Sequence, residues 1–338
     1  MKRVGIVGAG MIANWHAERW QHLPVEIAAH YDHKPEAAAQ AAERFGGEAV
    51  TSLEALLERV DIVDVCTPTP AHKEAVLAAA AAGKAIICEK PMARHLADAE
   101  AMLQACEQAG VPLFIAHVVR FFPQYAQAKA LCDQGALGNP GVLRTVRGGS
   151  FPRPNAQSWY SDFASSGGVV MDLSIHDLDF ARWCFGDVTR VFARGLTFQQ
   201  QPMRDHVSIV LSFANGAIGH IEGSWAYPPG QFVTSLELAG SEGLLEWDGL
   251  DPAPLQGSLR SRSDLTDVSN SASSPLVPED DPYYQELAHA LACFEQGSPM
   301  RVTPQDGVMA LKLALAVIAS LRSGQPVELA DFQEEVAL

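Results

Sequence analysis

The sequence is short of positive charge and has no long apolar run, and these two absences exclude two classes of partner. Lysine and arginine together number 24 against 40 aspartate and glutamate residues, so the formal net charge is −16 at pH 7. Such a balance argues against a nucleic-acid backbone or an anionic membrane surface as the main partner. No stretch approaches the ~20 consecutive apolar residues of a membrane span. We therefore expect a small-molecule ligand, with no nucleic acid and no membrane.

Paired cysteines are also missing. The six cysteines show neither C-x-x-C pairing nor the spacing of a metal site, which indicates small buried apolar residues in a reducing compartment. The short apolar run at the N-terminus leads directly into a glycine turn, which argues against a signal peptide. We expect a cytoplasmic protein with no bound metal. The cysteines are Cys66, Cys88, Cys106, Cys132, Cys184 and Cys293.

What the sequence does contain, at its N-terminus, is a pattern typical of dinucleotide binding. An apolar, strand-like run breaks at Gly8, and a helix-like segment follows. Gly8 permits a tight turn, Gly10 lets the backbone approach a pyrophosphate, and Ala13 lets helix and strand pack closely. The phosphates would lie at the helix N-terminus, where unpaired N–H groups and the helix dipole favour an anion. A second apolar run ends at Asp32, whose carboxylate can accept hydrogen bonds from both ribose hydroxyls.

The order of the elements predicts two domains. The chain has 338 residues, 48% of them hydrophobic, which is enough for two globular domains. Strand-like and helix-like segments alternate at first, as in a parallel sheet with right-handed crossovers. Later, strand-like runs follow one another, and Asn215-Gly216 joins two of them as a hairpin. We predict an α/β fold, with a doubly wound parallel sheet over residues 1–118 and an α+β domain with an antiparallel sheet over 119–338. Residues 251–282, rich in Pro, Ser and Asp, are expected to form a surface excursion.

A helix expected over residues 167–185 carries a polar stripe. At 100° per residue, Asp172, His176 and Asp179 lie on one narrow face of an otherwise apolar, buried segment. Buried carboxylates and imidazoles are costly unless they are paired. One interpretation is that Asp172 and His176 satisfy each other in the core. The other is that His176 is a general base, oriented by a carboxylate and facing a cleft.

A lysine follows one strand of the predicted parallel sheet, at the edge where ligands bind in such sheets. It lies in the sequence Glu89-Lys90-Pro91. A lysine in a loop is commonly a solvated surface charge. At this edge its ammonium could instead hydrogen-bond a substrate hydroxyl and stabilise developing negative charge. Pro91 would stiffen the turn that directs Lys90.

Four other residues are weaker candidates. Arg120, where the pattern of elements changes, either packs between domains or contacts substrate. Trp159 and Tyr160 either pack within their loop or stack on a ring, with their polar tips free for hydroxyls. His72 follows a Pro-rich turn. It is better explained as a helix-start residue than as a base, and we keep it among the candidates for cofactor binding.

Together these motifs resemble the glucose–fructose oxidoreductase / inositol dehydrogenase (Gfo/Idh/MocA) family. The resemblance covers nearly the whole chain, and Glu-Lys-Pro with a later D-x-x-x-H-x-x-D is specific in combination. It implies a Rossmann domain, a C-terminal domain with a large open antiparallel sheet, and homodimers or homotetramers built on that sheet. It also implies NAD(P)-dependent hydride transfer at a carbon of a sugar, sugar acid or cyclitol. One departure is Ser174, where many members of the family have glycine.

The resemblance also assigns roles to residues. Lys90, Asp172 and His176 match the family's catalytic lysine, aspartate and histidine, and Pro91 matches a proline that is often cis. We expect NAD as the cofactor, because Asp32 would repel a 2′-phosphate, although His33 and Lys34 leave NADP open. The residues expected to bind the cofactor are Gly8, Gly10, Met11, Ile12, Asp32, Thr67, Pro68, His72, Glu89 and Lys90.

Two other functions fit the same sequence. One is the reduction of another small carbonyl or imine substrate on the same scaffold. The other is a ligand sensor or co-repressor, because some proteins that resemble this family bind dinucleotide without catalysis. Such proteins tend to lose the lysine or the histidine, whereas Lys90, Asp172 and His176 are all present here. The sequence therefore favours an enzyme.

Overall fold

The structure is a computed structural model, and it describes residues 1–151, 159–197, 205–250, 255–259 and 280–334. The surface excursion expected over 251–282 falls largely outside these residues. The chain forms two compact units: residues 1–121 with 274–308, and residues 122–273 with 309–338.

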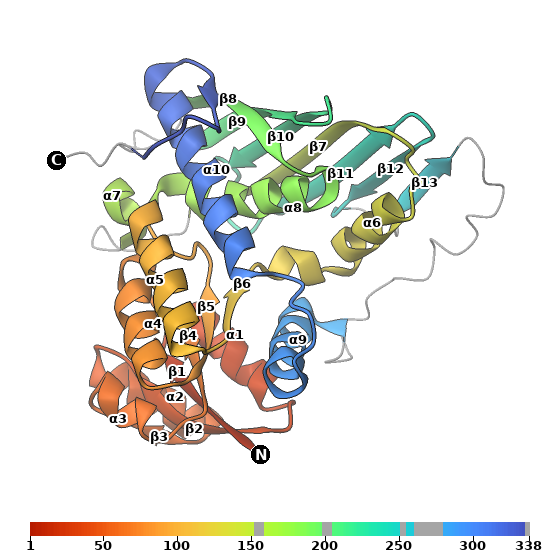
Figure 1. Ribbon diagram of the computed structural model, residues 1–338. Helices are drawn as coiled ribbons and strands as arrows, with labels where there is room; N and C mark the ends of the chain where they lie inside the picture. The colour runs from red at the N-terminus through yellow and green to blue at the C-terminus, as the bar shows by residue number, and fades with distance from the viewer. Residues whose placement is uncertain (152–158, 198–204, 251–254, 260–279, 335–338) are drawn as a thin grey trace. The chain divides into compact units, whose positions relative to one another are not determined.

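The first unit is built on a six-stranded sheet in the order β3-β2-β1-β4-β5-β6 (Figure 1). Every neighbouring pair in it is parallel, as the alternation of segments predicts. Its apolar strands are buried because helices cover a doubly wound sheet on both faces. The strands are β1 (Lys2–Val7), β2 (Val25–Tyr31), β3 (Glu48–Ala49), β4 (Ile62–Val65), β5 (Ala85–Glu89) and β6 (Leu113–Ala116).

Six α-helices and two 3₁₀ turns complete the first unit in the described residues. Helices α4 and α5 pack against each other (Figure 1), and α9 packs on α1. The α-helices are α1 (Met11–Trp20), α2 (Pro35–Phe45), α3 (Leu53–Leu57), α4 (His72–Ala81), α5 (Leu96–Ala109) and α9 (Pro282–Gln296). The 3₁₀ turns are η1 (Thr69–Ala71) and η2 (Val118–Phe121).

The late helix α9 belongs to the first unit, whereas the sequence predicts a single boundary near residue 118. Its N-cap Asp281 forms an ion pair with Arg19 of α1, at 2.7 Å from Nη2 to Oδ2. The ring of Tyr283 meets Trp15 edge-on, with 5.3 Å between centroids. These contacts join positions more than 260 residues apart, which no local pattern in the sequence can indicate.

The second unit contains a mixed, mostly antiparallel eight-stranded sheet in the order β13-β12-β11-β7-β10-β9-β8-β14. Only β7 and β10 pair in parallel among its described strands. The expected hairpin at Asn215-Gly216 joins β9 to β10, and Gly216 has a positive φ of 88°. The strands are β7 (Pro140–Gly149), β8 (Val188–Leu196), β9 (His206–Phe213), β10 (Ile218–Ser224), β11 (Phe232–Gly240), β12 (Gly243–Asp248), β13 (Gln256–Leu259) and β14 (Val327–Glu328).

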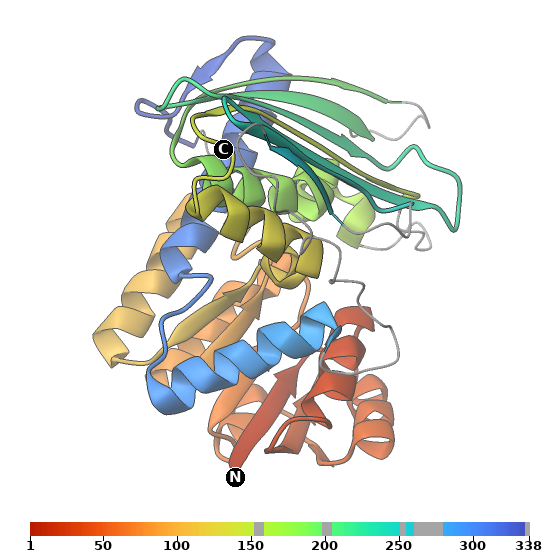
Figure 2. The same cartoon turned by 90° about the vertical axis from the view of Figure 1, so that its right-hand side faces the viewer.

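Helices of the second unit pack against one face of this sheet (Figure 2). Helix α8 contacts both β7 and β10, and α6 packs on α8. Burial alternates along β9, as expected for a sheet with one covered face. The elements are α6 (Pro123–Asp133), η3 (Trp159–Ser161), α7 (Phe163–Ser166), a π-helical turn η4 (Val170–Ser174) and α8 (Ile175–Phe185).

The last long helix, α10 (Pro304–Ser323), begins in the first unit and ends in the second. The helix has 20 residues and a mean hydropathy of 1.3, so by length and composition alone it could cross a membrane. Such a segment is not expected from the sequence, because charged and polar residues interrupt its apolar runs. Many of its side chains are nevertheless buried inside the protein, among them Leu311, Leu313 and Val317. This burial is typical of the core helix of a globular protein.

Candidate active site

The glycine turn joins β1 to α1 as the sequence predicts. Gly8 has φ of +105°, and a Cβ there would lie 2.7 Å from the carbonyl oxygen of Cys66. Only glycine fits such a position. A Cβ at Gly10 would meet no atom within 4 Å among the described residues, so the space beside this turn is open. The open space and the N-terminal N–H groups of α1 fit a bound pyrophosphate. Next to them, the side chain of Met11 is 67% exposed.

Asp32 is already engaged with the glycine turn. Its Oδ2 accepts a hydrogen bond from the backbone N–H of Ala9 at 2.8 Å, and its Oδ1 accepts one from the backbone N–H of Lys34 at 2.8 Å. The exposed ring of His33 also lies 3.0 Å from Oδ1. Each carboxylate oxygen has a second lone pair, so these bonds orient the group and leave acceptor capacity for ribose hydroxyls.

His72 lies where the sequence favours it, at the start of α4, but its ring is buried. Its Nε2 is 2.9 Å from the carbonyl oxygen of Thr67, and its Nδ1 is 3.1 Å from that of Pro91. Burial lowers the pKa of His72 by more than the hydrogen bonds to these backbone carbonyl groups raise it. His72 thus links the loops that follow β4 and β5. Direct contact of His72, Thr67 or Pro68 with a cofactor stays a prediction.

The Glu89-Lys90-Pro91 turn begins where β5 ends. The Glu89 side chain is buried, and its Oε2 accepts a hydrogen bond from the backbone N–H of Lys90 at 3.1 Å. The Lys90–Pro91 peptide bond is cis, as the family resemblance implies. Lys90 itself is half-buried. The lysine therefore lies at the carboxyl end of the parallel sheet, and it is not the fully solvated charge of the simpler interpretation.

Arg120 is buried, in contrast to a surface arginine. Its Nη1 donates to the carbonyl oxygen of Arg301 at 2.7 Å and pairs with Asp306 Oδ2 at 3.2 Å. Burial raises the pKa of Asp306, but Arg120 and the hydrogen bonds from Thr303 outweigh it and lower that pKa to about 2. The arginine thus helps to fix the first turn of α10. A contact between Arg120 and substrate stays a prediction.

The uniform helix expected over 167–185 is wrong in its first part. Residues 170–174 form a π-helical turn, and the α-helix begins only at Ile175. The 100° spacing therefore does not apply to Asp172, because a π turn hydrogen-bonds i to i+5. Asp172 is half-buried, whereas His176 and Asp179 are 8% and 2% exposed. Isolated π turns in helices are frequent at functional sites.

Trp225, which the sequence gives no reason to single out, reaches Asp172. Its indole Nε1 donates to Asp172 Oδ2 at 3.2 Å. The tryptophan follows β10 and is 1% exposed, and its ring meets Phe151 edge-on at 5.0 Å between centroids. The indole therefore holds the carboxylate from a buried position directly after β10.

A buried ion pair anchors α8 next to His176. Arg147 of β7 binds Asp177 with two hydrogen bonds, Nε to Oδ2 at 2.6 Å and Nη2 to Oδ1 at 3.3 Å. The same Nη2 donates to the hydroxyl of Tyr125 at 3.0 Å. Sequence reasoning missed this pair. An acidic residue in an apolar helix, with an arginine in a neighbouring apolar strand, was the available signal.

Gly223 on β10 leaves space for Ser174, the residue that replaces the glycine found in many members of the family. A Cβ at Gly223 of β10 would lie 2.0 Å from Ser174 Oγ. The larger residue in the π turn is thus accommodated by the missing side chain in the sheet.

Trp159 and Tyr160 lie in the 3₁₀ turn η3, and their rings contact each other with 4.2 Å between centroids and a tilt of 32°. Residues 152–158, just before them, fall outside the described part of the chain. A substrate contact by either ring stays a prediction.

The six cysteines are all free. Cys66, Cys88, Cys106 and Cys293 are buried as expected, whereas Cys132 and Cys184 are half-buried.

Comparison with known proteins places these features in context. Residues 2–117 match the model of an oxidoreductase family with an NAD-binding Rossmann fold, and residues 125–246 match the GFO/IDH/MocA C-terminal domain. A myo-inositol 2-dehydrogenase of Thermotoga maritima is 31% identical over 97% of this chain and 98% of its own. A D-apiose dehydrogenase of Paraburkholderia graminis is 32% identical over 98% and 90%. The crystal structure of GenD2 from gentamicin A biosynthesis, in complex with NAD, is 26% identical with a TM-score of 0.83, covering 97% and 96%.

Proposed function

This chain belongs to the GFO/IDH/MocA family of NAD-dependent oxidoreductases, and we propose that its substrate is a sugar, sugar acid or inositol-like cyclitol. The observation that carries the proposal is the set of three side chains suited to hydride transfer. Lys90 lies at the carboxyl end of β5, Asp172 lies in the π turn that precedes α8, and His176 lies in the first turn of α8. The myo-inositol and D-apiose dehydrogenases among the relatives support a polyhydroxylated substrate.

Residues of the first unit fit the cofactor. The N-terminus of α1 and the open space at Gly10 would hold the phosphates, and Asp32 would bind the adenosine ribose. When bound, NAD supplies the hydride acceptor. Asp32 favours NAD over NADP because its carboxylate would repel a 2′-phosphate.

We assign general acid–base catalysis to residues of the second unit. His176 removes the hydroxyl proton from the carbon that loses hydride, and Asp172 orients the imidazole. Lys90 hydrogen-bonds the substrate oxygen and stabilises it as it becomes a carbonyl. In the reverse direction the same histidine returns the proton.

We also propose roles for the two domains, an oligomeric state and a cellular location. Residues 1–118 bind the dinucleotide, and residues 119–338 bind substrate and form a homodimer or homotetramer. The eight-stranded sheet supports an interface between subunits, because large apolar side chains are exposed on its strands. They are Leu196, Ile218 and Phe232. We place the enzyme in the cytoplasm, which fits its free cysteines.

A substrate panel tests the proposal. Purified protein with NAD is mixed with inositols, aldoses and sugar acids, and cofactor reduction is followed by ultraviolet absorbance. We expect turnover with at least one polyol and a loss of ~10²–10³ in rate in Lys90→Met, with NADH affinity retained. NADH oxidation only by another carbonyl or imine compound would identify the reductase alternative. Tight NAD binding with no turnover in either direction would identify a sensor.

A further inference from the structure

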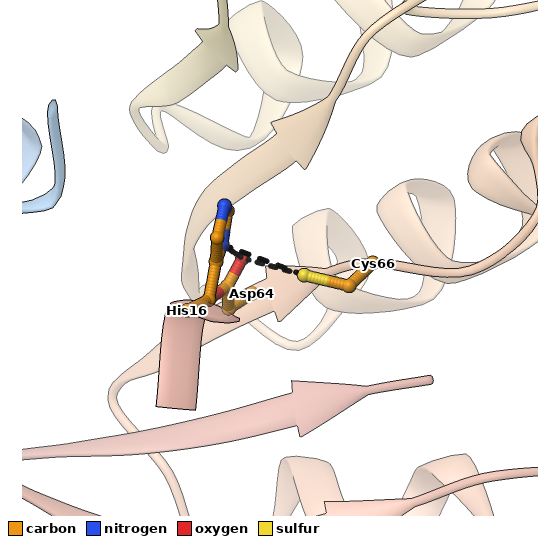
Figure 3. A group of neighbouring side chains, drawn as sticks. All are labelled: His16, Asp64 and Cys66. Atoms are coloured by element: carbon orange, nitrogen blue, oxygen red, sulfur yellow. Dashed lines mark hydrogen bonds and ion pairs between the residues drawn. The ribbon is translucent and has the colours of Figure 1, made fainter. Parts of the chain in front are cut away.

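The first unit holds a buried polar cluster that the proposed mechanism does not use. We call it the His16 cluster; its members are His16 of α1, Asp64 of β4, Cys66 just after β4, and Glu89 of β5. All four side chains are buried. Figure 3 shows three of them: Nδ1 of His16 faces the Asp64 carboxylate, and the Cys66 thiol lies within hydrogen-bond distance of both.

His16 bridges two carboxylates. Its Nδ1 lies 3.0 Å from Asp64 Oδ2, and its Nε2 lies 3.2 Å from Glu89 Oε1. The second contact is an ion pair without a hydrogen bond, because the N–H of Nε2 is not aligned with an acceptor among the described residues. Asp64 is held further by the indole N–H of Trp20 at 2.8 Å and by the Cys66 thiol at 3.4 Å.

Charge explains why the bridge persists inside the core. Burial lowers the pKa of His16, but Asp64 and Cys66 outweigh burial and raise it well above 6.5. A protonated ring that donates from Nδ1 to Asp64 places one positive charge between the two buried carboxylates and compensates them. From α9, Glu286 and Tyr283 face the same cluster. Burial raises the pKa of both, and Glu89 raises both further, which favours their neutral forms.

The bridge ends at the backbone of the lysine. Glu89 presents Oε1 to His16 and Oε2 to the N–H of Lys90, at 3.2 and 3.1 Å. With Oε1 next to His16, Oε2 is the oxygen that accepts this N–H. The path Asp64–His16–Glu89 therefore fixes the residue that precedes the proposed catalytic lysine, with no side chain of the path exposed to solvent.

We propose that His16 is a positioning residue for hydride transfer: by bridging Asp64 and Glu89, it holds the carboxylate that fixes the backbone of Lys90. This inference rests on the proposed function, because it assigns His16 a task only if Lys90 acts on the substrate. A displacement of about 1 Å in a catalytic group can lower the rate 10²-fold.

A metal ion is the competing explanation of the cluster. The ligand atoms of His16, Asp64 and Cys66 lie within 4.8 Å of one another, a spacing that also suits a metal. The three residues already hydrogen-bond one another, and Trp20 occupies a lone pair of Asp64. Elemental analysis of the purified protein is expected to find no stoichiometric zinc. About one equivalent of zinc per chain would contradict the proposal that His16 bridges Asp64 and Glu89 without a metal.

The kinetic test compares His16→Gln with a matched histidine control. His289 of α9 is half-buried in the same unit, and its Nε2 accepts the backbone N–H of Arg301 at 2.9 Å. We expect His16→Gln to lower kcat about 10–100-fold while KM and NADH affinity stay near wild type. His289→Gln is expected to keep kcat. If His16→Gln does not fold, Glu89→Gln, which keeps the shape and removes the charge, is expected to show the same loss of kcat.

Combination with Lys90→Met separates this inference from the proposed function. In the Lys90→Met background, His16→Gln is expected to cause no further loss in the residual rate, because the two residues lie on one path. Near-normal turnover of Lys90→Met alone would contradict the proposed function. If Lys90→Met is inactive but His16→Gln or Glu89→Gln keeps the wild-type kcat with a lower Tm, the cluster only stabilises the core, and the inference is overturned.

Discussion

Trp225 donates its indole N–H to Asp172 across 3.2 Å, from a buried position after β10 to the π turn before α8. The sheet thus holds the carboxylate that we assign to orienting His176. A donor that acts on a charged acceptor in a low-dielectric site has a larger effect than one in water.

Trp225→Phe is expected to lower kcat about tenfold, which corresponds to ~1.4 kcal/mol of barrier. Phenylalanine keeps most of the ring packing against Phe151 and removes only the N–H. Steady-state kinetics with the substrate found in the panel measure this effect. Trp247→Phe, in β12 of the same sheet, is the control and is expected to keep kcat. If Trp225→Phe keeps the same kcat as Trp247→Phe and the wild type, the indole N–H has no part in catalysis.

Gly223→Ala is expected to disturb the π turn. The new Cβ would lie 2.0 Å from Ser174 Oγ in a packed core, and overpacking of this kind costs ~1–3 kcal/mol. Chemical denaturation measures the loss of stability. Ser174→Gly in the same background removes the clash and is expected to recover most of it. No recovery in the double variant would locate the strain elsewhere, for example at Val207, whose Cγ1 would lie 3.2 Å from the new Cβ.

Asp32→Ala is expected to narrow the preference for NAD over NADP. The variant loses both the ribose acceptor and the charge that repels a 2′-phosphate, so NAD affinity falls and NADP affinity rises. Titration with each cofactor measures the two dissociation constants. Because Asp32 also accepts the Ala9 N–H, Asp32→Asn separates charge from orientation. Clearly tighter binding of NADP by the wild type would contradict the assignment.

Glu286→Gln is expected to stabilise the protein at alkaline pH. Burial, followed by Glu89, raises the pKa of Glu286 well above 4.5, and neither carboxyl oxygen has a partner among the described residues. The folded state binds this proton more tightly than the unfolded chain. Its contribution to the unfolding free energy is therefore fully present below pH 4.5 and is lost as pH rises through the folded pKa.

Unfolding free energies of wild type and Glu286→Gln at about pH 5 and about pH 8 test this sign. The advantage of the variant is expected to grow with pH. Glu295→Gln, an exposed glutamate on the same helix, is expected to give no pH-dependent difference. An advantage for Glu286→Gln that shrinks as pH rises would show that folding lowers the pKa of Glu286 instead of raising it.

Local chemistry explains what could be predicted. The turn at Gly8 depends on a positive φ, and Asp32 follows a strand at a fixed distance, so both are visible in a short stretch of sequence. The family resemblance also implied the cis bond before Pro91 and the three catalytic candidates. The local structure around these candidates could not be predicted. The π turn shifts Asp172 off the helical wheel, and Ser174 within that turn packs against Gly223 on a distant strand.

Long-range packing explains what could not be predicted. Helix α9 joins the first unit through Arg19 and Asp281, a pair separated by 262 residues. The bridge from Asp64 through His16 depends on three elements that meet only in the fold. A buried aspartate in an apolar strand was the one sequence signal for this cluster, and its partners could not be read from spacing.

In the proposed reaction, hydride passes directly from a hydroxyl-bearing carbon of the substrate to the bound nicotinamide. The most direct measurement of this step is isotope transfer with the polyol found in the panel, deuterated at the carbon that is oxidised, followed by mass spectrometry of the reduced cofactor. We expect one deuterium per molecule of NADH formed, since the carbinol hydrogen moves as hydride without exchange with water. Reduced cofactor that carries no deuterium would contradict the account.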